Sequence, residues 1–139
     1  MKLLEEMKIY NLFISHAWEY NEDYYRLENM LDNVEDFKWR NYSVPVHNAI
    51  DSNDDQELEE ALRNQIRPTS AVLITSGMYV SYRKWIQKEI DIAIDMDKPI
   101  IAVIPWGNQK IPQEVQNVAD AIVKWNTFSL VGAIEELSL

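Results

Sequence analysis

The sequence predicts an α/β fold, in which a parallel sheet has helices packed on both faces. Short apolar runs of strand length alternate along the chain with longer segments of helical periodicity, an order that is typical of parallel sheets. One run, Ala71–Thr75, is continuously apolar, as expected of a central strand that is buried on both faces. The chain has 139 residues, 47% of them hydrophobic, so we expect a single domain that spans residues 1–139.

Two strands and a helix are predicted before residue 50. The first strand is Ile9–Ile14, which is rich in β-forming residues and too short for a buried helix. Asn21 can cap a helix that runs from Glu22 to about Asn33. The inner stripe of this helix is formed by Tyr24, Leu27, Met30, Leu31 and Val34. A second strand is expected from Phe37 to Val44, where Pro45 ends it.

The remaining elements continue the alternation. Asp54, with Glu57 three residues later, resembles a capping box for a helix that ends before Pro68. After the Ala71–Thr75 strand we expect a helix over Arg83–Met96. The last elements are a strand at Pro99–Ile104, a short helix near Gln113–Val118, a strand at Ala121–Trp125 and a helix at Thr127–Leu137.

Five strands, each followed by a helix or helical segment, match the flavodoxin-like three-layer fold with strand order 2-1-3-4-5. In this order the switch point lies between the first and third strands, and ligands bind beyond the carboxyl ends of those strands. Polar and aromatic residues follow both strands, and they are Ser15, His16, Trp18 and Ser76. We therefore expect a binding crevice at these residues, although His16 can equally hydrogen-bond a backbone carbonyl at the strand end.

A glutamate on the apolar side of the Arg83–Met96 helix is the strongest candidate for a functional residue. One apolar stripe of this helix is formed by Ile86, Ile90, Ala93 and Ile94, and a second by Trp85, Ile92 and Met96. Glu89 projects between the two stripes, one turn after Trp85. A carboxylate in apolar surroundings destabilises the fold unless it is paired or used. Two interpretations stay open: a buried ion pair or rim position, and a functional carboxylate that faces the crevice.

Composition and charge exclude several classes of function. A formal net charge of −10 argues against nucleic acid as a partner. The chain has no cysteine and two histidines, so we expect no disulfide, no catalytic thiolate and no metal site. There is no apolar run of about 18 residues and no signal-peptide core, so we expect a cytoplasmic protein without a membrane partner. No Gly-x-Ser-x-Gly elbow supports a serine hydrolase.

Five segments carry a resemblance to a known family. They are Phe13-Ile14-Ser15-His16-Ala17-Trp18, Tyr42-Ser43-Val44-Pro45, Ser76-Gly77-Met78-Tyr79, Lys84-Trp85-Ile86-Gln87-Lys88-Glu89-Ile90 and Ile104-Pro105-Trp106-Gly107. Together they resemble the TIR-like domains of bacterial Thoeris anti-phage defence systems, within the Toll/interleukin-receptor (TIR) superfamily. The resemblance runs in order from about Ile9 to Leu137, and it implies the flavodoxin-like fold that the strand pattern predicts.

The resemblance also implies an activity. Enzymatic TIR domains cleave NAD at the nicotinamide–ribose bond with a glutamate in a Trp-x-x-x-Glu helix, which corresponds to Trp85 and Glu89 here. It therefore implies an NAD nucleosidase or ADP-ribosyl cyclase with Glu89 as catalytic residue, NAD as substrate and no cofactor. In phage-sensing members the ADP-ribose product is cyclised or conjugated into a signal for a separate effector. A phage-derived trigger and self-association are further candidate interactions.

The residues suit this chemistry. Loss of neutral nicotinamide leaves a ribose of oxocarbenium character, and a carboxylate in an apolar crevice stabilises that positive charge. Trp85 can stack on a ring or shape the pocket wall, and Ser15, His16 and Ser76 can donate hydrogen bonds to the diphosphate and ribose. Two alternatives stay open: an enzyme like the nucleoside deoxyribosyltransferases, and a non-catalytic TIR-like module for signalling or self-association.

Overall fold

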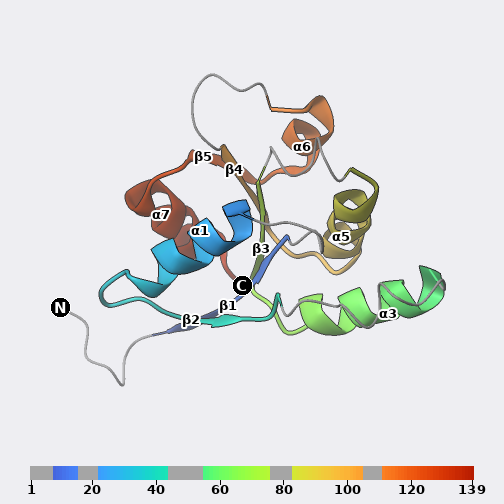
Figure 1. Ribbon diagram of the computed structural model, residues 1–139, viewed down its shortest axis with the longest axis horizontal. Coiled ribbons are helices and arrows are strands. Elements are labelled where there is room, and N and C mark those ends of the chain that lie inside the picture. The colour runs from blue at the N-terminus through green and yellow to red at the C-terminus, as the bar shows by residue number, and fades with distance from the viewer. Residues whose placement is uncertain (1–7, 16–21, 44–54, 76–82, 105–110) are drawn as a thin grey trace.

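The computed structural model describes residues 8–15, 22–43, 55–75, 83–104 and 111–139. In these ranges the five strands form one all-parallel sheet in the order β2-β1-β3-β4-β5. The strands are β1 (Ile9–Ile14), β2 (Lys38–Asn41), β3 (Ala71–Thr75), β4 (Ile100–Ile104) and β5 (Ala121–Lys124). The helices are α1 (Glu22–Asp32), α3 (Asp55–Ile66), α5 (Arg83–Asp95), α6 (Gln113–Val118) and α7 (Thr127–Leu137). This architecture (Figure 1) confirms the predicted fold class and strand order.

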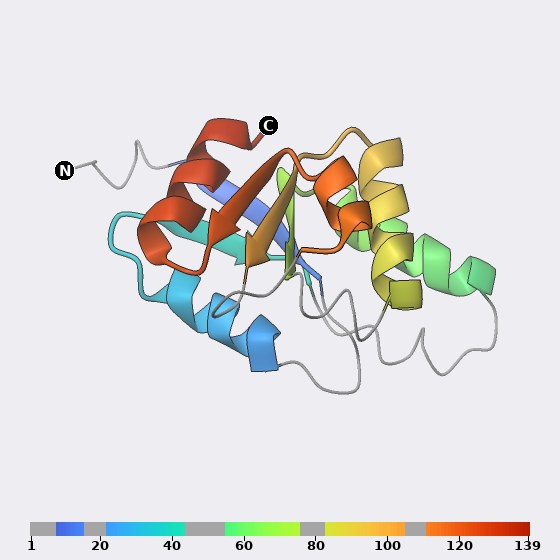
Figure 2. The ribbon, with the colours of Figure 1, turned by 90° about the horizontal axis from the view of Figure 1, so that it is seen from above.

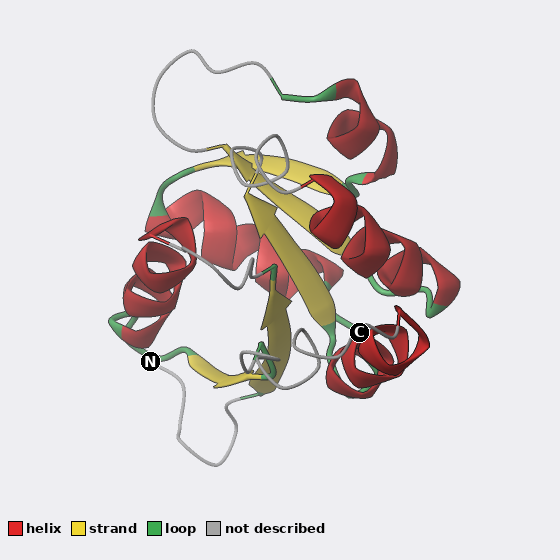
Figure 3. Ribbon diagram, turned by 45° about the vertical axis from the view of Figure 1, so that its right-hand side comes forward, coloured by secondary structure: helices red, strands yellow, loops and turns green. Residues whose placement is uncertain are grey.

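The helices form two layers, one on each face of the sheet (Figures 2 and 3). Helices α1 and α7 pack on one face and α3, α5 and α6 on the other, because successive side chains of a strand point to opposite faces. In β1, Leu12 and Ile14 belong to the α1–α7 core, whereas Phe13 belongs to the α5 core. Every residue of the central strand β3 is buried, as its apolar composition predicts.

The strand register brings the carboxyl ends of β1 and β3 together. Ile14 of β1 pairs with Leu73 of β3, so Ser15, the residue that follows β1, lies beside the last residues of β3. Ser15 continues the pairing, because its backbone N–H donates to the Leu73 carbonyl oxygen at 2.8 Å. The edge where we expected a crevice is therefore formed by neighbouring strands.

The structure corrects the predicted second strand, because β2 ends at Asn41, three residues before the predicted Val44. The Asn41 side-chain carbonyl accepts a hydrogen bond from the Ser43 backbone N–H at 2.8 Å. A side chain that satisfies a nearby backbone donor competes with the strand ladder and favours a turn. Val44, Pro45 and the predicted caps Asn21 and Asp54 lie outside the described residues.

The structure also corrects one member of the apolar stripe of α5. Ile86, Ile90, Ile92 and Ala93 are buried, but Ile94 is 49% exposed. At 100° per residue, Ile94 lies roughly a third of a turn from the middle of the buried face. The face that meets the sheet is centred near Glu89 and Ala93, so the helix is rotated toward Glu89 and away from Ile94.

None of the described helices is long and apolar enough to cross a membrane.

Candidate active site

Glu89 is the buried carboxylate of the described structure. It lies in the second turn of α5, which follows β3 along the chain, and its side chain has no solvent exposure. Its helical neighbours Ile86, Ile90 and Ala93 are buried in the core between α5 and the sheet. The amphipathic pattern predicted a carboxylate on this face, and the structure places it there.

Ser15 meets Glu89 from the end of β1. Side chains alternate along β1, so Ser15 points to the same face as Phe13, which packs against α5. The Ser15 hydroxyl donates a hydrogen bond to Glu89 Oε1 at 3.1 Å, and both side chains are fully buried. A charged acceptor strengthens such a bond relative to a neutral one. The contact joins two residues that are 74 positions apart in the sequence.

A second group of polar residues holds the end of β1 from the α1 side. The backbone N–H of Ile14 donates to the hydroxyl oxygen of Ser43, and Tyr42 N–H donates to the Leu12 carbonyl oxygen at 2.9 Å. The Tyr24 hydroxyl donates to the Ser43 carbonyl oxygen at 3.3 Å and accepts from Asn41 Nδ2 at 2.7 Å. Ser15 therefore follows a residue whose backbone is bonded to Ser43, two residues after β2, and Ser43 is in turn bonded to Tyr24 of α1.

The Tyr24 hydroxyl lies in a site that disfavours its ionised form. Burial, the larger effect, raises the pKa of Tyr24 to about 12, and the hydrogen bond from Asn41 opposes this rise. The nearby Glu28 carboxylate also raises the pKa, and Asn41 Nδ2 donates to its Oε2 at 2.7 Å. Tyr24 therefore stays neutral at physiological pH and acts as a hydrogen-bond donor.

Thr75 is a polar residue at this edge that the sequence analysis did not select. It ends β3, is fully buried, and its hydroxyl has no hydrogen-bond partner in the described part of the chain. The alternation along β3 places it on the α1–α7 face, opposite Glu89. A polar last residue in an otherwise apolar strand is the signal that could have singled it out. The roles of Tyr24, Asn41 and Ser43 had no such local signal, because their contacts depend on tertiary packing.

Of the residues predicted for the site, the structure brings together Ser15 and Glu89. His16, Trp18 and Ser76 lie outside the described residues. Trp85 lies in the first turn of α5, and its side chain is outside the described part of the structure. The catalytic role of Glu89 and the binding roles of the other five residues stay predictions.

Two cavities lined by described residues lie away from this contact. One, of about 290 Å³, is next to the first residues of β1 and β2, and the other, of about 300 Å³, is next to the first residues of β4. Both are therefore at the amino ends of the strands, opposite the edge that holds Ser15 and Glu89. No group of three or more metal-ligating side chains is found among the described residues.

Comparison with known proteins gives one match to a family model. Residues 13–110 match the family described as "Thoeris protein ThsB, TIR-like domain", which covers more than half of the 139 residues. The matched region includes Ser15 and Glu89. No curated protein matches the chain in a sequence comparison.

Among solved structures, the chain is similar to a 3-dehydroquinate dehydratase-like protein from Bifidobacterium longum. The two chains are 11% identical, the match covers 94% of this chain and 95% of that chain, and the TM-score is 0.46.

Proposed function

This chain belongs to the TIR-like domain family of the Thoeris protein ThsB, and we propose that it cleaves NAD at the nicotinamide–ribose bond. The observation that carries the proposal is the buried Glu89 carboxylate, which accepts a hydrogen bond from Ser15 at the carboxyl end of β1. This is the edge of an open parallel sheet where ligands bind, beside the point at which strand order reverses.

In the proposed reaction, Glu89 stabilises charge that develops in the transition state. Nicotinamide leaves as a neutral base, and the bond between its ring nitrogen and the anomeric carbon of the ribose breaks. Positive charge then grows on the ribose, as in glycoside cleavage generally. A carboxylate in an apolar environment attracts this charge more strongly than a carboxylate in water does. A neutral leaving group needs no general acid, so a single carboxylate is sufficient.

The hydrogen bond from Ser15 has a clear part in this mechanism. It fixes one carboxylate oxygen, so that Glu89 is held in place before the substrate arrives. We expect His16, Trp18, Ser76 and Trp85 to contribute to NAD binding, as the sequence predicts for residues that follow β1 and β3.

The burial of Glu89 has a consequence for regulation. Both Ser15 and Glu89 are inaccessible to solvent, so cleavage requires a conformation in which the ribose reaches the carboxylate. We therefore expect slow turnover by the chain alone and faster turnover with a phage-derived trigger or on self-association. The anomeric carbon would then bond to a nucleophilic atom of the same ADP-ribose group or of a second molecule, and the cyclised or conjugated product would activate a separate effector.

The test is nicotinamide release from NAD by the purified chain, with and without lysate from phage-infected cells. Glu89→Gln keeps the size of the side chain and removes its charge. We expect it to lower turnover on the order of 10²-fold or more, with little change in NAD affinity, because the charge acts mainly in the transition state. Asp91→Asn is the matched control, since it removes an exposed carboxylate from the same helix.

Each competing interpretation gives a different result. A non-catalytic module releases no nicotinamide from the unmodified chain under either condition. A deoxyribosyltransferase-like enzyme leaves NAD intact but exchanges the base of a deoxynucleoside. A purely structural Glu89 gives a Gln variant that unfolds at a lower temperature yet releases nicotinamide at the original rate, and that result would falsify the proposed role.

A further inference from the structure

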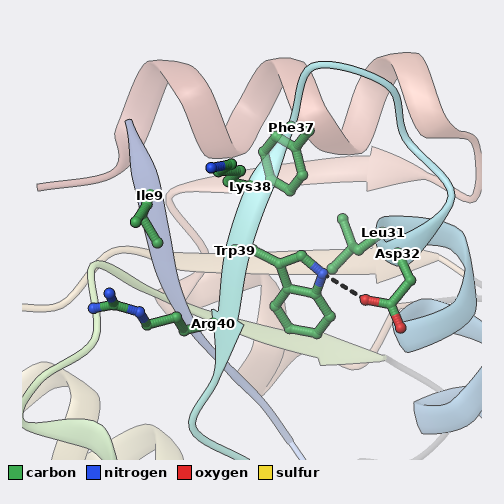
Figure 4. Close-up of a pocket in the computed structure, with 7 residues that line it drawn as sticks. All are labelled: Ile9, Leu31, Asp32, Phe37, Lys38, Trp39 and Arg40. Carbon is green, nitrogen blue, oxygen red and sulfur yellow. Dashed lines mark hydrogen bonds between the residues drawn. The ribbon is translucent and has the colours of Figure 1, made fainter. Parts of the chain in front are cut away.

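The outer edge of β2 carries a basic and aromatic surface at the opposite end of the sheet from Glu89. The cavity of about 290 Å³ at this edge is lined by residues of β2, the start of β1 and the end of α1 (Figure 4). Lys38 and Arg40 of β2 contribute cations to it, and Trp39 contributes apolar surface. We call this the β2-edge surface.

This surface carries two cations close together in an acidic chain. The net charge of the chain is −10, and Arg26 and Arg63 are held by Glu22 and by Asp95. Lys38 and Arg40 are exposed, and neither side chain makes an ion pair or hydrogen bond within the described ranges. They are two positions apart on one strand, so they project to the same face. Two cations that are two positions apart on one strand suit a ligand whose negative charges repeat at the same spacing.

The apolar part of the surface is fixed in place. The indole N–H of Trp39 donates to Asp32 Oδ1 at 2.9 Å, which holds the ring across the end of α1 (Figure 4). Phe37 stacks on Tyr10 with ring centroids 5.2 Å apart and an angle of 10° between the rings. Ordered aromatic rings cost little conformational entropy when a partner binds.

In the part of the chain that the structure describes, no strand pairs with the outer backbone edge of β2. In the sheet order, β2 is the outermost strand and pairs with β1 on its inner side. An edge strand presents backbone N–H and C=O groups that can pair with an added strand, and this is a common mode of peptide recognition. Lys38 and Arg40 lie on one face of β2 and Trp39 lies on the other. The residues of an added strand that contact the two cations should therefore be two positions apart.

We propose that the β2-edge surface binds an extended acidic segment of a partner protein, which adds to the sheet as a strand beside β2. Its carboxylates, at every second position, face Lys38 and Arg40. The apolar residue between them packs beside Trp39, where the Asp32 carboxylate would repel an acid. Because this surface lies at the amino ends of the strands, the proposal is independent of NAD cleavage.

A short peptide tests the proposal directly. The probe is a dye-labelled, capped Glu-Val-Glu-Leu-Glu peptide, the comparison peptide is Lys-Val-Lys-Leu-Lys, and binding to the full chain is measured by fluorescence anisotropy. We expect the acidic peptide to bind and the basic peptide not to bind. The affinity for the acidic peptide should fall as NaCl is raised from about 0.05 to 0.5 M. The indole N–H resonance of Trp39, assigned with Trp39→Phe, should shift when the acidic peptide is added.

Charge reversal locates the binding site. The double variant Lys38→Glu/Arg40→Glu should lose roughly tenfold or more in affinity for the acidic peptide. The matched control is Arg67→Glu/Lys124→Glu, which makes the same change in net charge at exposed positions elsewhere, including the opposite edge strand β5. It should keep the affinity within about twofold, and circular dichroism should show that both double variants are folded.

Three results would overturn the proposal. The first is equal binding of the acidic and basic peptides. The second is a folded Lys38→Glu/Arg40→Glu variant that binds the acidic peptide as tightly as the control variant does. The third is an unmodified chain that is a dimer and a Lys38→Glu/Arg40→Glu variant that is a monomer but still binds the peptide. That result would assign the surface to a second copy of the chain.

Discussion

At the carboxyl end of β1, a single hydroxyl connects the strand to the carboxylate of α5. Ser15 and Glu89 are both buried, and the Ser15 hydroxyl donates to Glu89 Oε1 at 3.1 Å. A buried acceptor that loses its donor costs more than the bond itself contributes, because the acceptor stays out of water. The contact therefore matters for stability whether or not Glu89 is catalytic.

Ser15→Ala should reveal both contributions. We expect it to lower the free energy of unfolding by about 1–3 kcal/mol and nicotinamide release by roughly tenfold, because Glu89 loses one of the contacts that orient it. Urea unfolding and the nicotinamide assay measure the two effects. Ser129→Ala, which removes a partly buried hydroxyl from α7, is the control and should leave both unchanged.

The double variant with Glu89→Gln separates coupling from coincidence. Because both substitutions alter the same hydrogen bond, their effects on stability should be less than additive. Strictly additive losses would mean that Ser15 and Glu89 act independently, and the positioning role of Ser15 would then be wrong.

On the scale of an element, α5 shows how the sheet selects one face of an amphipathic helix. The helix packs against α3, where Arg63 Nη1 lies 2.7 Å from Asp95 Oδ2. The face toward the sheet includes Ile90 and Glu89, whereas Ile94 is 49% exposed. An exposed ion pair contributes little to stability, so burial of the apolar residues is what sets the rotation of the helix.

Two isoleucines of α5 allow this rotation to be tested with the same substitution. Ile90→Ala removes a fully buried side chain and should lower the free energy of unfolding by about 2–5 kcal/mol. Ile94→Ala removes a half-exposed one and should cost less than about 1 kcal/mol. Urea unfolding of the two variants gives the comparison, and equal losses would contradict the described orientation of α5.

For the molecule as a whole, stability at high pH depends on a phenol that lies between α1 and β2. Burial raises the pKa of Tyr24 from its ordinary 10.0 to about 12. The folded state then holds this proton more tightly than the unfolded chain does. The contribution of Tyr24 to stability is therefore complete below pH 10.0 and is lost as the pH rises toward about 12.

Tyr24→Phe should flatten this dependence. The variant lacks the ionisable group, so its free energy of unfolding should fall less steeply between about pH 10 and 12 than that of the unmodified chain. Tyr25→Phe, which changes a neighbouring tyrosine that is 55% exposed, should keep the original slope. Urea titrations across this pH range provide the measurement, and parallel curves for all three proteins would contradict the prediction.

The sequence alone was sufficient for the fold and for one half of the candidate site. Hydrophobic periodicity is a local property, so it predicted the five strands, the helices between them and the position of Glu89 on the apolar side of α5. Five strands, each followed by a helix or helical segment, then favoured the order that the structure shows. Errors in the bounds of elements occurred at their ends, as in β2, where an Asn41 side-chain contact ends the strand.

Tertiary structure decided which groups meet. The Ser15–Glu89 contact spans 74 positions and the contact of Ile14 with Ser43 spans 29, and no local pattern specifies a partner at such a distance. The sequence placed Ile94 in an apolar stripe, but the sheet buries the side of α5 that lies between the two stripes, and Ile94 is left 49% exposed. Local sequence determines what each element exposes on each face, and packing of those faces determines which atoms come within bonding distance.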